Sequence, residues 1–180
     1  MNPLLQKTID LSEQSVKGEY ARPYHAILAA GLKAMFSDKT FSYMKDYLKD
    51  IKSAEQIPDL VSHGIIKLLS IIWNESKGNM KLEPIGPAAM TLMAHALDYI
   101  EHSMNIPITK DVLAQTTMLV NKGVLHFMKV TLKLSDDEFD KLMRGQGKEI
   151  VNSRRASEAA PPEPGLVNQP ASPPAMQGVM

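Results

Sequence analysis

The chain has 180 residues, enough for one domain with a sizeable core, and 44% of them are hydrophobic, as in an ordinary globular protein. Basic and acidic residues balance at 20 each, which argues against nucleic-acid or anionic-lipid binding through bulk charge, although not against a local patch. The absence of cysteine excludes disulfides, thiolate catalysis and zinc–cysteine sites.

Apolar residues at helical spacing predict helices over residues 2–16, 22–36 and 38–53. The stripe is cleanest in the second segment, where Pro23 is placed to open the helix. In the third segment lysines and aspartates alternate, which favours a solvated helix face over a nucleic-acid site. The opening MNPLLQKTIDLSEQ lacks the basic and apolar regions of a signal peptide, so we expect no leader.

A strongly apolar helix is predicted to begin at Pro58 and to continue through PDLVSHGIIKLLSIIWNES. Its apolar residues cover more than one stripe, which predicts burial on most sides. Lys77-Gly78-Asn79 is expected to stop the helix. The apolar run at residues 60–73 is too short to span a bilayer and contains Lys67.

The next stretch, PIGPAAMTLMAHALDYIEHSMN, predicts a central helix over residues 84–105. Its apolar and small residues form one stripe, and Pro84 and Pro87 suit its opening turn. Its alanines leave little side chain between this helix and its neighbours, so other backbones can come close. Thr109 is expected to cap a following helix. The predicted core positions of that helix are Leu113, Val120, Val124 and Phe127.

Residues 128–134 alternate between apolar and polar, which is the period of a half-buried strand. Either the preceding helix continues, which we favour because a single strand would have no partner in this chain, or a strand pairs with another subunit. Ser135 then opens a last short helix, with Glu138 completing a capping box. The expected buried face of this helix is Phe139, Leu142 and Met143.

The composition changes after residue 151. Six of the 12 prolines lie in residues 152–180, among Ala, Ser, Gly and Gln, so this segment cannot build a core. We therefore predict an all-α fold: a single helical bundle of about six helices at 1–151 and an extended Pro-rich C-terminal tail at 152–180. A polyproline-like tail can lie along a partner's groove at low ordering cost. Its candidate partner-binding residues are Leu166, Val167, Met176, Val179 and Met180.

Residues with reactive side chains give little sign of catalysis. His95, Asp98 and His102 share one face of the central helix with Glu101 beside them, which is a possible metal-ligand arrangement. The same spacing is ordinary on the polar face of a helix, and we favour that interpretation. No nucleophile elbow or phosphate-binding loop is present in the sequence. We therefore expect no enzymatic activity, no metal and no cofactor.

Part of the chain, with Ala96-Leu97-Asp98 near the end of one predicted helix and Ile108-Thr109, Leu113-Ala114 and Thr117 at the start of the next, resembles small helical virion proteins of short-tailed bacteriophages. In that pattern a Pro/Ala-led helix ending in Ala-Leu-Asp is followed by a short hinge and an I-T-x-x-x-L-A-x-x-T helix. The corresponding residues here lie between 83 and 134, and the ending GLVNQPASPPAMQGVM is similar to the tails of such proteins.

The resemblance implies a structural role in the virion, with assembly in the host cytoplasm. The protein would be an internal or ejection protein, or would belong to the portal–tail assembly. Its partners would be other copies of itself and portal, tail or ejection proteins. It would bind no sequence-specific nucleic acid, and transient contact with a membrane would be possible. Copies would pack through helix faces, and the tail would strap a neighbour. Close helix approaches between copies would then be marked by Gly31, Gly64, Gly86 and Gly123, although a monomer would use the same glycines for its internal packing.

Two other interpretations remain open. The chain could be a bacterial cytoplasmic helical adaptor or chaperone-like protein-binding module. It could also be a membrane-active protein that uses residues 60–73 once they are released from the fold.

Overall fold

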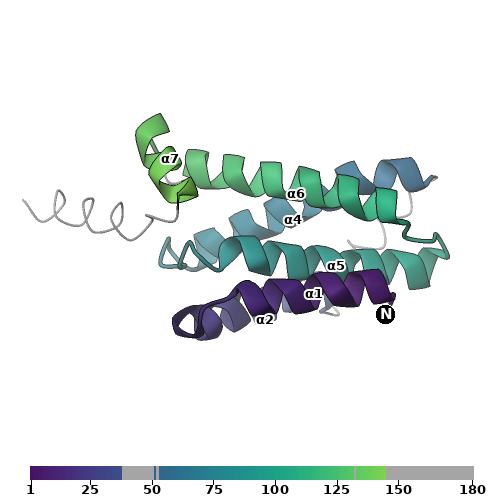
Figure 1. Cartoon of the computed structure of the whole chain (residues 1–180). Helices are drawn as coiled ribbons and strands as arrows, with labels where there is room; N and C mark the ends of the chain where they lie inside the picture. The colour runs from purple at the N-terminus through teal and green to yellow at the C-terminus, as the bar shows by residue number, and fades with distance from the viewer. Residues whose placement is uncertain (38–50, 52, 132, 145–180) are drawn as a thin grey trace, which may run out of the picture.

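A computed structural model describes residues 1–37, 51, 53–131 and 133–144. Within them the fold is all-α and forms one helical bundle, as the periodicities predicted (Figure 1). The predicted helix at 38–53 lies almost entirely outside the described residues, as do the tail at 152–180 and its candidate residues. The elements are α1 (Pro3–Ser15), η1 (Gly18–Tyr20), α2 (Ala21–Phe36), η2 (Ala54–Gln56), α4 (Ile57–Glu75), α5 (Ile85–Met104), α6 (Lys110–Thr131) and α7 (Asp136–Met143).

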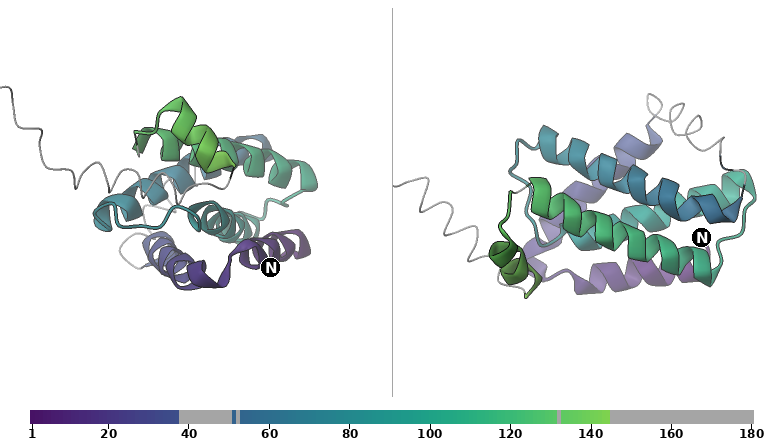
Figure 2. Two further views of the ribbon diagram at one scale, coloured as in Figure 1. Left: turned by 60° about the vertical axis from the view of Figure 1, so that its left-hand side comes forward. Right: turned by 90° about the horizontal axis from the view of Figure 1, so that it is seen from above.

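Helix α5 is the centre of the bundle, as predicted. Helices α1, α2, α4 and α6 all pack against it. The five long helices alternate in direction, so α4 and α6 run the same way, and they lie side by side (Figures 1 and 2). Small side chains on several sides of α5 let these neighbours approach. Its buried residues are Ile85, Ala88, Ala89, Thr91, Leu92, Met93, Ala94, Ala96, Leu97 and Ile100.

Two glycines mark very close approaches between helices of the same chain. A Cβ atom at Gly31 of α2 would lie 2.6 Å from Cδ2 of Leu92 in α5. A Cβ atom at Gly123 of α6 would lie 2.6 Å from Cγ1 of Ile66 in α4. At Gly64 and Gly86, by contrast, nothing described lies within 4 Å of the corresponding position. Only the first pair therefore serves the internal packing of the bundle.

Helix α4 is more exposed than its composition predicted. Ile57, Ile65 and Leu69 face the core, but one stripe that includes His63 and Lys67 is exposed. The prediction of burial on most sides overlooked that α4 is covered only where α2, α5 and α6 contact it.

The stop after α4 is confirmed. Lys77 and Gly78 adopt positive φ angles of 52° and 73°, and the Gly78 amide donates to the Trp73 carbonyl at 3.2 Å. Glycine tolerates the left-handed conformation at this kind of helix end without steric cost. The chain can therefore turn here toward the start of α5.

Helix α6 begins as predicted, but one core position is shifted. The Val112 amide donates to Oγ1 of Thr109 at 3.3 Å, which confirms the cap. Val120, Val124 and Phe127 are buried. Leu113 is only half-buried, and the inward positions of the first turns are Val112 and Thr116 instead. A polar Thr116 can face the core because its hydroxyl donates to the Val112 carbonyl at 2.6 Å.

The first part of the ambiguous segment at 128–134 is helical, and residue 132 lies outside the described residues. Helix α6 continues to Thr131, and no strand occurs among the described residues. Lys133 then adopts a positive φ of 49°, and Leu134 returns to the core. The Ser135 amide donates to Oε2 of Glu138 at 2.8 Å, and the Glu138 amide donates to Oγ of Ser135 at 3.3 Å. The predicted capping box is therefore present at the start of α7.

Membrane crossing was considered for the apolar run in α4. In the portion of the chain that the structure describes, no helix is long and apolar enough to cross a membrane.

Candidate functional site

The polar cluster predicted on the central helix forms near the C-terminal end of α5, but with one residue fewer. Ligand atoms of Asp98, Glu101 and His102 all lie within 4.8 Å of one another. His95, one turn earlier, does not join this group. Burial lowers the pKa of His95, and the negative charge of Asp98 opposes this shift in part. Among the described residues, the candidate cation ligands are therefore Asp98, Glu101 and His102.

Glu101 is already engaged in holding the chain together. Its Oε1 accepts hydrogen bonds from the Ile108 amide at 3.0 Å and from Nδ2 of Asn2 at 3.1 Å. Asn2 in turn caps α1, because its Oδ1 accepts from the Leu4 amide at 3.0 Å. We call Asn2, Glu101 and Ile108 the Glu101 clasp. It joins the start of α1, the last turns of α5 and the segment that leads into α6.

Asp98 and His102 form the exposed edge of the same cluster. Nδ1 of His102 lies 2.8 Å from the Asp98 carbonyl oxygen and 3.4 Å from Oδ1 of Asp98. That carboxylate oxygen is buried and makes no hydrogen bond within the described chain, but the N-terminal ammonium of Met1 lies 3.9 Å from it. Since the His102 side chain is 62% exposed, we assign the pair the weak role of a surface i, i+4 contact.

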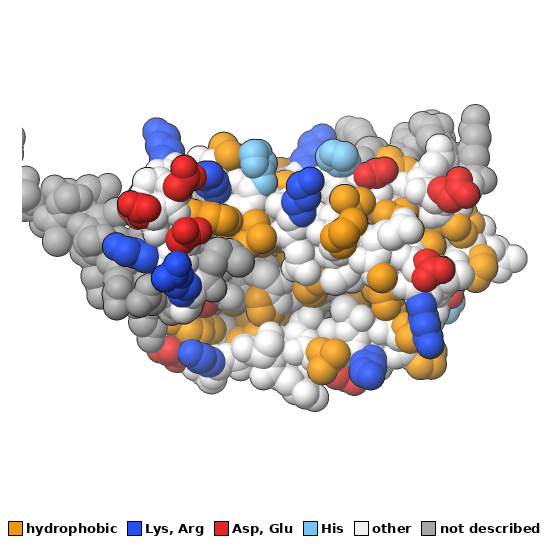
Figure 3. All heavy atoms as spheres, turned by 45° about the horizontal axis from the view of Figure 1, so that its top comes forward, with side chains coloured by type: hydrophobic (Ala, Val, Ile, Leu, Met, Phe, Trp, Pro, Cys, Tyr) orange, Lys and Arg blue, Asp and Glu red, His pale blue; other side chains and the backbone are white. Residues whose placement is uncertain are grey.

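A second candidate region, which was not predicted from the sequence, lies on α4 and α6. Residues 60–74 and 112–131 contain no aspartate or glutamate, and the two segments belong to helices that pack side by side. Figure 3 shows basic and hydrophobic side chains gathered over these helices, with acidic ones toward both ends. We call this surface the α4–α6 outer face. Its exposed residues are His63, Lys67, Ile71, Met118, Lys122, His126 and Val130.

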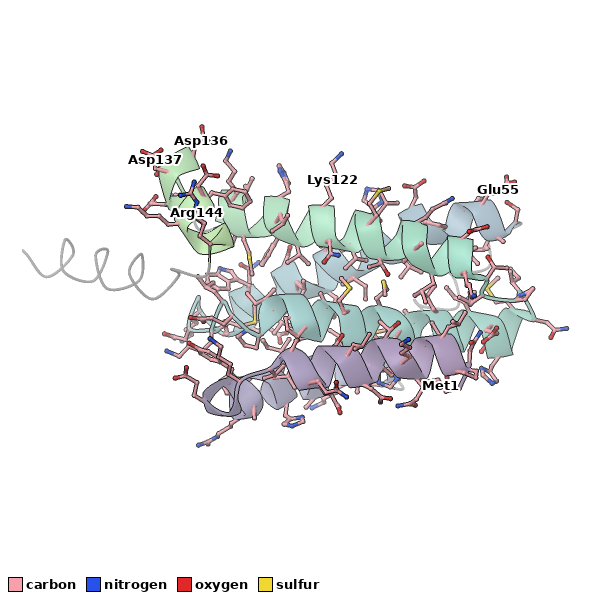
Figure 4. The ribbon with its side chains drawn as sticks, in the orientation of Figure 1. Met1, Glu55, Lys122, Asp136, Asp137 and Arg144 are labelled. Carbon is pink, nitrogen blue, oxygen red and sulfur yellow. The ribbon has the colours of Figure 1, made fainter. Side chains whose placement is uncertain are left out.

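The cations of this face have few partners. The described residues provide Lys67 and Lys122 with no ion pair. Apolar side chains lie among them, with Met118 62% and Val130 58% exposed. Figure 4 shows Lys122 projecting outward from the middle of α6. The face therefore combines lysines that form no ion pair with described residues and exposed apolar side chains.

Helix α7 carries the opposite charge at the end of this face. The Asp136 carboxylate accepts a hydrogen bond from Lys129 Nζ, and this bond, with the lysine's charge, lowers the pKa of Asp136. The same ammonium lies 5.8 Å from the ring centroid of Phe139, which is within cation–π range. Figure 4 shows Asp136 and Asp137 in the first turn of α7, at the opposite end of the helix from Arg144. Asp137 and Asp140 are exposed.

No protein-family model, curated protein or solved structure matches the chain.

Proposed function

We propose that this chain is a non-enzymatic structural protein of a short-tailed bacteriophage particle that assembles with its own copies and with other virion proteins through its helix faces. What carries the proposal is the place of the phage-like residues in the fold. Ala96 and Leu97 are buried in α5, Ile108 is held by the Glu101 clasp, and Thr109 caps α6. The resembling segment thus encodes a packed helix–turn–helix connection.

The outward surfaces support a role in assembly. Large apolar side chains are exposed on three helices, namely Leu11 on α1, Ile71 on α4, and Met118 and Val130 on α6. Scattered apolar residues are normal on any surface, but those on α4 and α6 lie on the acid-free α4–α6 outer face. A partner chain that binds such a face can bury its apolar side chains and pair with its lysines.

Within the particle, the protein would lie inside the head and leave with the genome, or would belong to the portal–tail assembly. Its tail would strap a neighbouring subunit through the apolar points at Leu166, Val167, Met176, Val179 and Met180. A Pro-rich strap loses little conformational entropy when it binds, because it is extended beforehand.

Mass spectrometry of gradient-purified particles tests this proposal. We expect the protein at a fixed copy number relative to the major capsid protein, and fewer copies per particle when residues 152–180 are deleted. Absence from purified particles overturns the proposal. The adaptor interpretation would then be favoured if the protein instead co-purified from host cytoplasm with a single bacterial protein.

A further inference from the structure

We propose that helix α7 of one copy docks on the α4–α6 outer face of a second copy through charge pairing. This inference rests on the proposed function in that both require the chain to assemble with itself. It goes further by naming the two surfaces that meet: the acidic side of α7, at Asp137 and Asp140, and the basic face, at Lys67 and Lys122.

The basic surface is unusual because nothing on its own helices neutralises it. Between Asp59 and Glu75 on α4, and between Asp111 and the end of α6, every charged side chain is a lysine. Nδ1 of His63 lies 2.9 Å from the Asp59 carbonyl oxygen, which leaves the other ring nitrogen available to a partner. His126 on α6 is exposed as well. A carboxylate approaching this face would thus meet cations and imidazoles without like-charge repulsion.

The acidic surface supplies the opposite charge. Asp137 and Asp140 are three residues apart, so they lie on the same side of α7, and both are exposed. Lys141 and Arg144 follow each of them by one turn, but the described residues give neither carboxylate an ion pair. The chain already contains one example of the proposed contact, since α7 pairs Asp136 with Lys129 of α6 and places the Phe139 ring near the same ammonium. The proposed interface repeats this pairing between copies, farther along the face.

The geometry favours a second copy over the chain's own α7. Asp136 is tied to Lys129 in the last turn of α6, and α7 lies beyond that end of the bundle (Figures 1 and 4). Lys122 is two turns earlier, about 10 Å back along α6. The Asp137 and Asp140 side chains are exposed and form no ion pair with another described residue, so they remain open to another molecule.

A contact between two different surfaces is heterologous. After one copy has docked, it still has a free outer face, and its partner still has a free α7. Such contacts propagate, and they close into a ring if the rotation between copies allows it. A discrete ring or a growing series of oligomers is therefore expected, in contrast to a closed two-fold dimer.

Charge reversal tests the pairing. Light scattering after size exclusion should show a mean mass that rises with the concentration of the full chain and falls in high salt. The variants K67E/K122E and D137K/D140K should each weaken self-association by at least about tenfold. The combined variant K67E/K122E/D137K/D140K should recover association, because both surfaces then carry reversed charge. Far-UV circular dichroism verifies that each variant remains helical.

A matched control keeps the charge change but moves it elsewhere. K7E/K33E introduces the same two reversals on exposed positions of α1 and α2, and it should associate like the unmodified chain. Because the chain has no cysteine, a K122C/D137C variant allows an independent test by oxidation. We expect disulfide-linked dimers and higher species on a non-reducing gel.

Several outcomes would overturn the inference. These are a chain that is monomeric at every concentration, association that none of the reversals changes, or a disulfide that forms only within one chain. Binding of a 20-mer duplex or of phosphatidylglycerol vesicles that K67E/K122E abolishes, in a chain that stays monomeric, would assign the face to a different partner. None of these results depends on whether the protein is found in particles, so the failure of this inference and that of the proposed function are distinguishable.

Discussion

The Glu101 clasp and the α4–α6 outer face use charged side chains in opposite ways. At the clasp, one carboxylate oxygen accepts hydrogen bonds from Asn2 and from the Ile108 amide. On the outer face, Lys67 and Lys122 have no ion pair among the residues described. The conspicuous cluster on α5 thus stabilises the fold through Glu101, whereas the less conspicuous lysines form no ion pair with any described residue.

The largest expected effect is the difference in stability between a side-chain truncation at the centre of the bundle and one on the outer face. Leu97 of α5 is fully buried, so Leu97→Ala should lower the free energy of unfolding by about 3 kcal/mol through lost burial and a residual cavity. Met118→Ala on the outer face should change it by less than about 0.5 kcal/mol. Urea denaturation of both variants measures the difference. Similar losses in the two would contradict the assignment of Met118 to a free surface.

The clasp itself is the next target. Glu101→Ala removes the acceptor of two hydrogen bonds, one of them to the Ile108 amide, and should cost about 2 kcal/mol. Glu101→Gln retains an acceptor oxygen, so it should cost less, on the order of 1 kcal/mol. Chemical denaturation again gives the values. If Glu101→Ala left the free energy of unfolding unchanged, the clasp would not stabilise the fold. Cation binding by Asp98, Glu101 and His102 would then have to be measured.

Two glycine-to-alanine substitutions compare the close contact between α6 and α4 with an open position on α4. Gly123→Ala places a methyl group 2.6 Å from Cγ1 of Ile66, so we expect a net loss of about 1–2 kcal/mol after the better helix propensity of alanine is included. Gly64→Ala has nothing within 4 Å, and it should stabilise the chain by up to about 1 kcal/mol. Thermal unfolding should show shifts of opposite sign. Two shifts of the same sign would refute the close approach at Gly123.

The smallest effect concerns pH. Burial lowers the pKa of His95 below its ordinary value, so the unfolded chain binds the proton more readily than the folded one. Stability should therefore fall as the pH decreases from about 6.5 toward the lowered pKa. His95→Gln should reduce the difference in melting temperature between pH 7 and pH 5. An unchanged difference would show that other groups control this dependence.

Much of the fold was predictable because its signals are local. The capping box at Ser135 and Glu138, the cap at Thr109 and the glycine stop after α4 each depend on residues a few positions apart. The stripe of α5 was clear because its spacing holds over the whole helix. Leu113 was wrongly placed because Val112 beside it is also apolar, and one residue rotates the inward direction by about 100°.

The site was less predictable because it depends on contacts between distant parts of the chain. Asn2 reaches Glu101 from 99 residues away, and no spacing rule links the two. The lack of acidic residues at 60–74 and 112–131 is visible in the sequence, but it becomes a surface only because α4 and α6 lie side by side. Spacing along α5 also grouped His95 with Asp98 and His102, yet it could not show that His95 would be half-buried.

The way α1 is attached has a consequence for the order in which the molecule opens. Helix α1 rests chiefly on α5, and the clasp fastens it at one end, whereas α5 is surrounded by four helices. Local opening in proteins begins where the fewest contacts must be broken. Backbone amide hydrogens of α1 should therefore exchange with heavy water well before those in the middle of α5, and loss of the Asn2 side chain should widen that gap.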